Sequence, residues 1–373
     1  MRITLVISSL TAGGAERVLS SLANEWAARD HVVTLVTLGP VLTDWFSVDP
    51  RVCRIGLDVL IGSVHTGDAV RHNIRRLSRL RRAIRTSNPE IVISFGDTTN
   101  VLTLLATIGL GVRVIVSERV DPRQQPLGAA WDYLRAFSYR RAEALVIQTE
   151  SLRQWADGVI SRKRVHVIPN PVRAGATHAQ YDQLQHCGNA RVIAIGRLTK
   201  QKGFDLLLEA FAQCHRRYTN WTLRILGDGE ERKALESQAS KLNIREAVEF
   251  IGVVKDHEAH LLGSQLYVLS SRYEGFPNSL LEAMAMGLAV IATDCPTGPA
   301  DIVSHNDNGL LVPPGDAAAL ADAMERLMGN ADQRSRLAQR AIEVRGRFSL
   351  DKILTCWDRL LLDSPVCQHP VRF

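Results

Sequence analysis

Short runs of apolar residues recur along the chain, and each is followed by a loop rich in glycine or polar residues. Apolar runs of four to eight residues bounded by turn signals are typical of strands buried on both faces, as in a parallel sheet. In the first half, the runs that predict strands are Arg2–Ser8, His31–Leu38, Glu90–Phe95, Val112–Val116, Ala144–Thr149 and the start of Arg164–Val172, which stops at a Pro-Asn-Pro turn. Apolar residues at helical spacing separate several of these runs, so we expect βαβ units.

The second half of the chain repeats this plan. Its predicted strands are Arg191–Ile195, a run that starts at Trp221, Val248–Val253, Ser264–Ser271 and Ala289–Thr293. Helices are expected at Ala318–Met328 and, with an amphipathic pattern, at Phe348–Leu362. The polar, irregular stretch Ala174–Asn189 predicts a linker. We therefore expect an α/β protein with one domain at residues 1–180, a second at 190–347, and a terminal helix at 348–373.

The composition agrees with a globular chain. Of the 373 residues, 46% are hydrophobic and 23% are charged, and this length favours two domains. Six cysteines without a C-x-x-C spacing indicate a reduced, cytoplasmic protein without a structural metal. The first apolar run fits a strand better than a signal peptide. The longest apolar stretch, Val101–Val116, contains Arg113 and is too short to cross a bilayer.

The net charge of +6 is concentrated in the first half, where residues 1–180 hold 23 Lys and Arg against 15 Asp and Glu. Residues 71–85 contain seven arginines and no acid, in a pattern that predicts a helix. One side of that helix would carry Arg71, Arg75, Arg79 and Arg82, and the opposite side Val70, Ile74, Leu77 and Ile84. We expect the apolar side to pack on the domain and the arginines to contact a diphosphate or anionic lipid head groups. The alternative is a solvated basic face.

The loop after the first predicted strand contains the pair Gly13-Gly14. It lacks the complete G-x-G-x-x-G of dinucleotide sites, and the second strand ends in Leu38-Gly39-Pro40 instead of an acid, so NAD is disfavoured. Two glycines still permit close backbone approach to a phosphate or a sugar. A plain tight turn is the alternative interpretation.

The most informative stretch is Glu274-Gly-Phe-Pro-Asn-Ser-Leu-Leu-Glu282. Its pattern predicts a tight loop, a helix that Asn278 caps, and free backbone N–H groups at Ser279–Leu281 that favour an anion. Glu274 and Glu282 flank this anion site, eight residues apart. Such an arrangement suits a ligand with a phosphate in the middle and hydroxyl-bearing rings at both ends, as in a nucleotide sugar.

This spacing resembles the E-x7-E motif of the retaining glycosyltransferases of family GT4, including Gly-Phe-Pro after the first glutamate and Glu-Ala-Met-Ala at the second. The run from Gly196-Arg197 to Lys202-Gly203 is similar to the family's G-R-x-x-x-x-K-G, in which arginine and lysine clamp the donor diphosphate. The resemblance covers nearly the whole chain. It implies the GT-B fold, with two Rossmann-like domains facing each other across a cleft and the helix at 348–373 crossing back onto the first domain.

The resemblance also implies roles for individual residues. Glu274, Arg197 and Lys202 would be catalytic, with Glu274 orienting the transferred sugar and the two cations stabilising the departing diphosphate. Glu282 would bind the nucleotide ribose. The complete set of expected donor-binding residues is Gly13, Gly14, Gly196, Val253, Phe276, Pro277, Asn278, Ser279, Leu280 and Glu282. No D-x-D pair is found in the expected donor loops, so we expect neither a metal nor any cofactor besides the nucleotide sugar.

Two loops of the first half, Gly96–Asn100 and Ser117–Pro122, would lie at the carboxyl edge of the predicted sheet, where ligands bind. Many GT4 enzymes carry a histidine near the second loop, where this chain has Ser-Glu-Arg-x-Asp-Pro. That pattern resembles the branch that builds bacterial surface polysaccharides and lipid-linked oligosaccharides. Asp97, Glu118 and Arg119 are therefore candidates for acceptor binding, together with the arginines of residues 71–85.

The resemblance implies transfer of a hexose or N-acetylhexosamine from a nucleotide sugar, with UDP favoured, and with retention of configuration. The basic first half points to a polyprenyl-diphosphate-linked glycan as acceptor and to peripheral contact with the cytoplasmic face of an anionic membrane. Three alternatives stay open: a soluble acceptor, a nucleotide-sugar epimerase of GT-B fold, and a module that binds nucleic acid through residues 71–85. The last is disfavoured because no aromatic residues alternate with these arginines.

Overall fold

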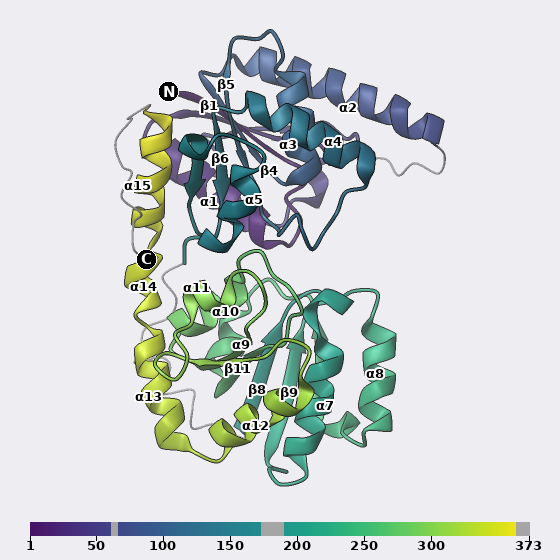
Figure 1. The fold of residues 1–373 in the computed structure, drawn as a ribbon, viewed down its shortest axis with the longest axis vertical. Coiled ribbons are helices and arrows are strands. Elements are labelled where there is room, and N and C mark those ends of the chain that lie inside the picture. The colour runs from purple at the N-terminus through teal and green to yellow at the C-terminus, as the bar shows by residue number, and fades with distance from the viewer. Residues whose placement is uncertain (61–65, 173–189, 363–373) are drawn as a thin grey trace. The chain divides into compact units, whose positions relative to one another are not determined.

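The computed structural model describes residues 1–60, 66–172 and 190–362, which form two compact units. Unit 1 contains Met1–Asn170 and the last helix from Ile353, and unit 2 contains Pro171–Lys352. Each unit is a parallel β-sheet with helices on both faces (Figure 1). The α/β prediction is therefore confirmed. The predicted linker Ala174–Asn189 lies outside the described residues.

Unit 1 contains a seven-stranded sheet of order β3-β2-β1-β4-β5-β6-β7, and every neighbouring pair is parallel. The strands are β1 (Arg2–Ile7), β2 (Val32–Thr37), β3 (Cys53–Gly56), β4 (Ile91–Phe95), β5 (Arg113–Ser117), β6 (Ala144–Ile147) and β7 (Val165–Val167). The strand order reverses between β1 and β4. In open α/β sheets, ligands bind beyond the carboxyl ends of the two strands at such a reversal.

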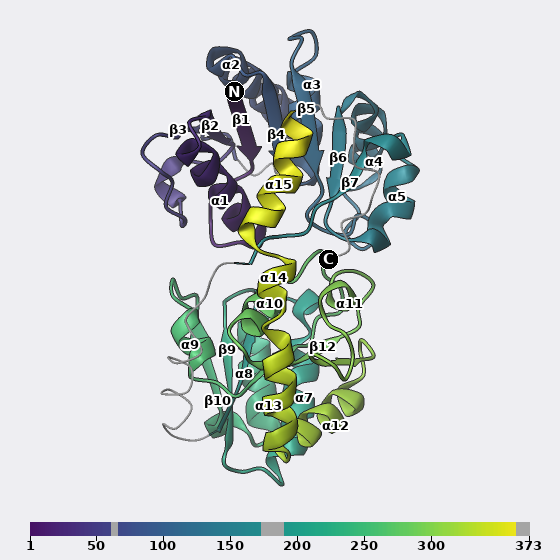
Figure 2. The same ribbon diagram turned by 90° about the vertical axis from the view of Figure 1, so that its left-hand side faces the viewer.

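The helices of unit 1 bury both faces of this sheet. They are α1 (Gly14–Ala28), α2 (Thr66–Ser87), α3 (Asp97–Ala106), α4 (Ala129–Ser138), α5 (Arg153–Asp157) and α15 (Leu350–Leu361). In Figure 2, α15 and α1 lie in front of β1 and β4, and α2 and α3 lie behind them. On the face covered by α2, a buried cluster joins this helix to the sheet. It contains Val92, Val116, Leu80 and Ile84.

The last helix, α15, is fastened to unit 1 by an aromatic cluster, an ion pair and hydrogen bonds, including those from Arg113 to the carbonyls of Leu360 and Leu361. Trp357 packs against Phe95 and Trp26, with ring centroids 5.8 and 6.4 Å apart. Asp358 accepts hydrogen bonds of 2.9 Å from the Trp26 indole and from Arg29. Contacts between such distant parts of the sequence make the last helix an integral part of the first unit's core.

Unit 2 has the order β10-β9-β8-β11-β12-β13, again parallel throughout, so the strand order reverses between β8 and β11. The strands are β8 (Ala190–Ile195), β9 (Trp221–Leu226), β10 (Val248–Gly252), β11 (Leu266–Leu269), β12 (Ala289–Thr293) and β13 (Leu310–Val312). The helices are α7 (Phe204–His215), α8 (Arg232–Lys241), α9 (Glu258–Leu262), α10 (Asn278–Ala285), α11 (Pro299–Ile302), α12 (Ala317–Met328), α13 (Ala331–Ala341) and α14 (Val344–Arg347). This strand order is that of a Rossmann domain.

Two buried clusters hold unit 2 together. One packs α7, α8 and α12 against the sheet, with Phe211, Leu235 and Met324 among its members. The other packs α9 and α10 against the opposite face, through Leu261 and Leu281. Within the described residues, no helix combines the length and apolar character needed to span a bilayer.

Candidate functional site

The strand reversal of unit 2 brings together the two motifs that the sequence separates. The Gly196–Gly203 loop follows β8, and the loop that contains Glu274 follows β11. Lys202 Nζ lies 2.6 Å from Glu274 Oε1, although the two residues are 72 positions apart. The basic loop and the first glutamate of the E-x7-E motif therefore form one cluster at the carboxyl edge of the sheet.

Glu274 is held tightly in this cluster. Its residue exposure is only 5%, and its Oε1 also accepts a 2.6 Å hydrogen bond from the Ser271 hydroxyl. The Thr297 hydroxyl donates to the Glu274 backbone carbonyl. A buried carboxylate is tolerated where cations and hydroxyls compensate for lost water, and Lys202 and Ser271 do so here. The carboxylate is thus fixed before any ligand arrives.

The basic loop is fastened to the Glu274 loop by several backbone contacts. The Ser270 hydroxyl donates to Lys202 O over 2.9 Å, and Arg272 N donates to Gln201 O over 2.8 Å. Gly203 has φ +62°, and a Cβ there would lie 2.2 Å from Ser270 O. Only glycine permits this close approach, so the glycine that ends the motif is a packing requirement.

Arg272 and Asp205 add a second connection across the same two loops. The guanidinium donates to both carboxylate oxygens over 2.8 and 2.7 Å, and it also reaches Lys200 O over 2.8 Å. This ion pair holds the pKa of Asp205 below its usual value. Neither residue belongs to the predicted site, and both help to fix the position of Lys202.

Arg197 differs from Lys202 in being exposed. No side-chain hydrogen bond or ion pair involves its guanidinium within the described residues. Arg197 is carried on a backbone turn that requires glycine beside it, because a Cβ on Gly227 would lie 1.9 Å from Gly196 O. An exposed guanidinium on a rigid loop is suited to binding an anion that arrives from solvent.

The short helix α10 starts one residue earlier than a cap at Asn278 requires. Asn278 is the first helical residue, the N-cap is Pro277, and no side-chain hydrogen bond is made by that cap. The prediction that Asn278 caps the helix is therefore wrong: proline already supplies the extended backbone conformation, with φ −78° and ψ 90°. Leu281 N donates to Pro277 O over 3.2 Å, so the expectation of a free N–H at Leu281 is wrong, and only the N–H groups before it precede the helical ladder.

The other predicted donor residues contribute in different ways. Ser279 accepts a 2.7 Å hydrogen bond from the buried Tyr267 hydroxyl, which fixes the first turn of α10 to β11. Leu280 is fully buried and Phe276 is 7% exposed, with its ring against Phe348. Their side chains belong to the core, so only their backbone atoms are candidates for ligand contact. Val253, after β10, is 52% exposed.

Glu282 has a partner that the sequence did not indicate. Its Oε2 lies 2.7 Å from Nε2 of His257, and the two side chains are 12% and 13% exposed. His257 immediately precedes α9, in the loop after β10. A single histidine in a loop carries no sequence signal of its own. The pairing depends on the strand order, which places the loop after β10 beside α10.

In unit 1, the Gly13-Gly14 pair lies at the start of α1, with Gly13 as N-cap. A Cβ on Gly13 would lie 2.2 Å from Oε2 of Glu16, so this carboxylate folds back over the helix start. Asp97 lies in the first turn of α3, directly after β4. Both loops follow the strands at which the order of this sheet reverses, as Rossmann-like ligand sites require.

Glu118 does not fit the predicted role in acceptor binding. It is fully buried, and its Oε1 accepts a 2.5 Å hydrogen bond from the Tyr139 hydroxyl and lies 3.7 Å from Arg135. Burial raises the pKa of Glu118 to about 7, and the hydrogen bond and Arg135 only partly oppose this effect. The carboxyl group faces the helical layer of α4, so it supports the loop from inside.

The neighbouring Arg119 has a different environment. Its guanidinium stacks on the Phe95 ring, 3.4 Å from the centroid, and donates to Asn170 Oδ1 over 2.7 Å. Burial lowers its pKa to about 9, and the charge of Glu16 partly opposes this shift. Phe95 also contacts Trp357 of α15. The last helix therefore supports Arg119 through one aromatic ring.

The arginine-rich helix α2 packs differently from the prediction. Ile84 is buried, but Val70 and Ile74 are 62% and 63% exposed, so the expected apolar side is covered only along the second half of the helix. Figure 1 shows why, because the first turns of α2 extend beyond α3 and α4. Arg79 donates to Leu57 O over 3.1 Å and helps to hold the helix.

The remaining arginines of the predicted stripe, Arg71, Arg75 and Arg82, are exposed. At the start of α2, two of them share the surface with Val70 and Ile74. This mixture of exposed aliphatic and guanidinium groups is a second candidate for function. Among the residues that the structure describes, no three or more metal-ligating side chains come together.

Two family descriptions, each matching one half, together cover most of the chain. Residues 13–171 match a glycosyl transferase 4-like domain, and residues 183–344 match glycosyl transferases group 1. LpsE, a lipopolysaccharide core biosynthesis glycosyltransferase from Rhizobium meliloti, is 32% identical over 63% of this chain and 68% of its own length. The chain belongs to this glycosyltransferase family.

Two further comparisons describe the glycosyltransferase over its full length. An N-acetyl-D-galactosaminyltransferase from Campylobacter jejuni, named for a diNAcBac-PP-undecaprenol-linked substrate, is 29% identical over 97% of this chain and 99% of its own length. HepE from Anabaena, solved with UDP-glucose, superposes with a TM-score of 0.81 at 18% identity, covering 96% of this chain and 98% of that one. The expected GT-B fold with two Rossmann-like domains is confirmed.

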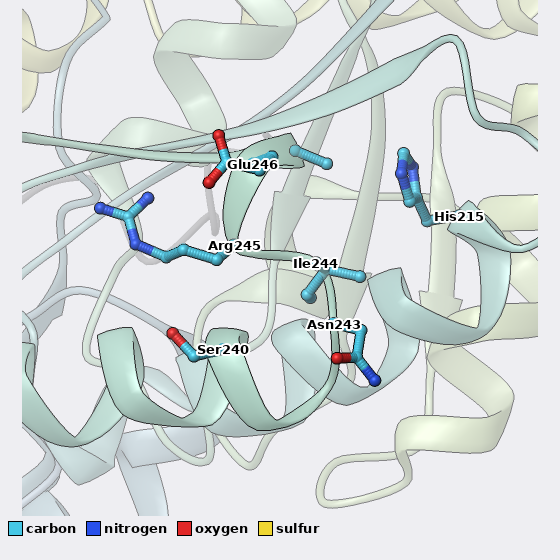
Figure 3. A pocket seen from close by; sticks show the side chains of 7 residues that line it. His215, Ser240, Asn243, Ile244, Arg245 and Glu246 are labelled. Atoms are coloured by element: carbon cyan, nitrogen blue, oxygen red, sulfur yellow. The ribbon is translucent and has the colours of Figure 1, made fainter.

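The glycosyltransferase also contains a pocket of about 310 Å³ away from these motifs (Figure 3). It is lined by His215, Ser240, Asn243, Ile244, Arg245, Glu246 and Ala247. These residues end α7 and α8 or directly precede β10, so the pocket lies at the amino edge of the sheet in unit 2. The conserved geometry of Rossmann domains places ligands at the other edge.

Proposed function

We propose that this glycosyltransferase moves a hexose or N-acetylhexosamine from a UDP-sugar to a polyprenyl-diphosphate-linked glycan, with retention of configuration, during synthesis of a bacterial cell-surface polysaccharide. The cluster of Lys202, Glu274 and Ser271 at the strand reversal of unit 2 is the observation that carries the donor half. HepE, which has the same fold, was solved with UDP-glucose. The name of the Campylobacter relative supplies the class of lipid-linked acceptor.

In this proposal, the donor diphosphate binds between Arg197, Lys202 and the backbone N–H groups at the start of α10. These donors stabilise the negative charge that develops as the bond between the sugar C1 and the diphosphate oxygen breaks, with its electron pair leaving on the diphosphate. The acceptor hydroxyl oxygen forms the new bond to C1 on the same face. Its proton passes to an oxygen of the leaving diphosphate, so the reaction needs no separate protein base, and Arg197 and Lys202 supply the positive charge that a metal would otherwise provide.

Glu274 would orient the transferred sugar by accepting hydrogen bonds from its hydroxyls. Its carboxylate already has fixed partners, and such preorganisation reduces the entropy lost when the substrate binds. Lys202 lies within hydrogen-bond distance of this carboxylate and would be positioned to contact the diphosphate with the same ammonium group. One ion pair would then connect the sugar half of the donor to its leaving group.

The acceptor half of the proposal rests on the start of α2. Exposed Arg71 and Arg75 would bind phosphate oxygens of anionic lipids or of the lipid diphosphate, and exposed Val70 and Ile74 would enter the interface between head groups and acyl chains. Such a surface holds a protein on the membrane peripherally. It would bring the glycosyltransferase to an acceptor whose polyprenyl chain cannot leave the bilayer.

The test is nucleotide release from UDP-, GDP- and ADP-sugars, with and without a polyprenyl-diphosphate-linked glycan, in buffer with EDTA. We expect release from a UDP-sugar that requires the lipid-linked glycan and continues in EDTA, and an α-linked donor should give an α-linked product by NMR. Release without the lipid would indicate plain hydrolysis of the donor or favour a soluble acceptor. Conversion of the donor alone into an isomer would contradict the transferase mechanism and favour an epimerase.

A further inference from the structure

Glu282 and His257 form an enclosed carboxylate–imidazole pair in unit 2. Their hydrogen bond of 2.7 Å joins α10 to the loop that precedes α9. Both side chains are about seven-eighths buried, at 12% and 13% exposure. If such a pair were exposed, it would contribute little to stability. Because this pair is enclosed, its hydrogen bond strongly restricts the orientation of both groups.

We propose that His257 positions the Glu282 carboxylate to bind the ribose hydroxyls of the donor nucleotide. This inference rests on the proposed function and adds a residue to its donor site. An ionised carboxylate can only accept hydrogen bonds, so Nε2 of His257 carries the proton in this pair. The bond therefore also fixes which ring nitrogen is protonated and holds the carboxylate in one plane.

A positioned carboxylate suits a ribose because both groups have matched hydrogen-bonding capacity. A carboxylate has about four lone-pair sites and accepts from several donors at once, so a bond from histidine leaves capacity for vicinal hydroxyls. Rossmann-like nucleotide sites use an acidic residue for the same sugar hydroxyls. A glutamate without a partner would lose rotamer freedom on binding, whereas His257 has already restricted this freedom in the free protein.

The simpler role would be a structural tie between α9 and α10. That role predicts that removal of His257 lowers stability and weakens every ligand of unit 2 equally. Positioning predicts a selective effect, because a site built to bond a hydroxyl discriminates against analogues that lack it. The difference between a ribonucleotide and its deoxy analogue therefore separates the two roles.

The experiment uses the full chain and isothermal titration calorimetry with UDP, 2′-deoxy-UDP and 3′-deoxy-UDP. We expect the unaltered protein to prefer UDP over at least one deoxy analogue by about tenfold or more, as for a hydrogen bond to a charged group. His257→Ala should reduce that preference to about twofold, mainly by lowering the affinity for UDP. His257→Gln, which keeps a donor, should restore part of it. In turnover assays, the donor KM should rise while kcat changes by less than about threefold.

His260→Ala is the matched control. His260 lies three residues further along, within α9, and its Nδ1 pairs with Arg224 at 3.2 Å instead of with Glu282. It should retain the full preference for UDP. Glu282→Gln should abolish the preference by itself, and adding His257→Ala to it should then have no further effect on the ratio between UDP and its analogues.

Two results would overturn the inference: an unchanged UDP preference in His257→Ala, or an equal loss of affinity for UDP and both analogues. The proposed function is judged separately, by whether the unaltered chain binds a nucleoside diphosphate. If GDP or ADP binds in place of UDP, the same comparison is made with the matching deoxy series. If none of UDP, GDP and ADP binds, the donor site and the role of His257 are rejected together.

Discussion

Each unit buries one glutamate near the carboxyl edge of its sheet, and the two have opposite surroundings. Glu274 of unit 2 is held by Lys202 and Ser271, which both belong to loops at the sheet edge. Glu118 of unit 1 is held by Tyr139 and Arg135, which belong to the helical layer. Burial alone therefore does not identify a functional carboxylate. The elements that supply its partners decide whether it faces a ligand or the core.

The largest expected difference concerns turnover. Glu274→Gln keeps the shape of the side chain but removes its charge, and we expect kcat to fall by about 10²–10³-fold, as when a preorganised polar group is removed from an active site. Binding of UDP should change by less than about fivefold. Glu118→Gln should retain kcat within about threefold, because the amide oxygen can still accept from Tyr139. Steady-state nucleotide release measures both variants.

Glu246→Gln serves as the control for these two changes, because Glu246 is exposed at the opposite edge of the sheet. It should behave like the unaltered protein. Comparable losses in Glu274→Gln and Glu118→Gln would contradict the distinction between edge and core. An unimpaired Glu274→Gln would remove Glu274 from the catalytic site.

The burial of Glu118 should also make the stability of the protein depend on pH. The pKa of Glu118 is raised to about 7 from a usual value of 4.5, so the folded state binds the extra proton more tightly than the unfolded state. Below about pH 4.5 this group does not disfavour folding. Between pH 4.5 and 7 its contribution lowers the free energy of unfolding by about 3 kcal/mol, at 1.36 kcal/mol per pKa unit.

Urea unfolding from pH 5 to pH 8 measures this effect, and Glu118→Gln supplies the comparison because it cannot ionise. As the pH rises from 5 to 8, we expect the unfolding free energy of the unaltered protein to fall relative to that of Glu118→Gln. A constant difference over this range would mean that Glu118 stays ionised beside Arg135, in contradiction to the buried, protonated group.

A matched pair of lysines tests the partner of Glu274. Lys202 pairs with the carboxylate, whereas Lys200 lies in the same short turn and is exposed. Lys202→Met should lower kcat by about 100-fold through loss of charge at the leaving group. Lys200→Met should stay within about threefold. Equal effects would assign the loss to the net charge of the loop instead of the ion pair. Steady-state release of UDP gives both values.

The smallest expected effect concerns the surface of unit 1. Arg71→Glu combined with Arg75→Glu should weaken binding to anionic vesicles by about 10–30-fold, at about 1 kcal/mol for each basic residue near such a surface. UDP affinity should not change, because α2 belongs to unit 1 whereas the proposed binding site for the diphosphate is formed by residues of unit 2. The control, Arg162→Glu with Lys163→Glu, alters the same charge at an exposed site before β7. Vesicle sedimentation that falls equally for both pairs would indicate a nonspecific effect of charge.

The sequence predicted the strands of both sheets well because a strand buried on both faces is a continuous apolar run. Short β3 and β13 were missed, since four and three residues give too little pattern. The approach of Lys202 to Glu274 could be anticipated only through the family resemblance. Periodicity alone cannot show which loops meet, because strand order is set by long-range packing.

The misassignments have a common physical reason. Helical periodicity correctly placed Val70 and Ile74 on one side of α2, but it carries no information on how far neighbouring helices extend, and these residues are exposed. Likewise, the position of Glu118 after a strand was recognised, whereas the direction of its side chain depends on Tyr139 and Arg135 from later elements. The pairing of His257 with Glu282 depends on a contact between a loop and the distant helix α10, and it left no local signal.

The attachment of α15 to unit 1 determines the order in which the chain completes its folding during synthesis. The core around Trp26 and Phe95 needs Trp357, which the ribosome makes after the whole of unit 2. At 5–20 residues per second, the stretch between Asn170 and Ile353 takes on the order of 10–40 s to synthesise. During that interval the nascent first unit exposes the apolar surface that α15 later covers. A chain terminated before Trp357 would keep this surface exposed permanently, which makes it a natural substrate for chaperones and proteases.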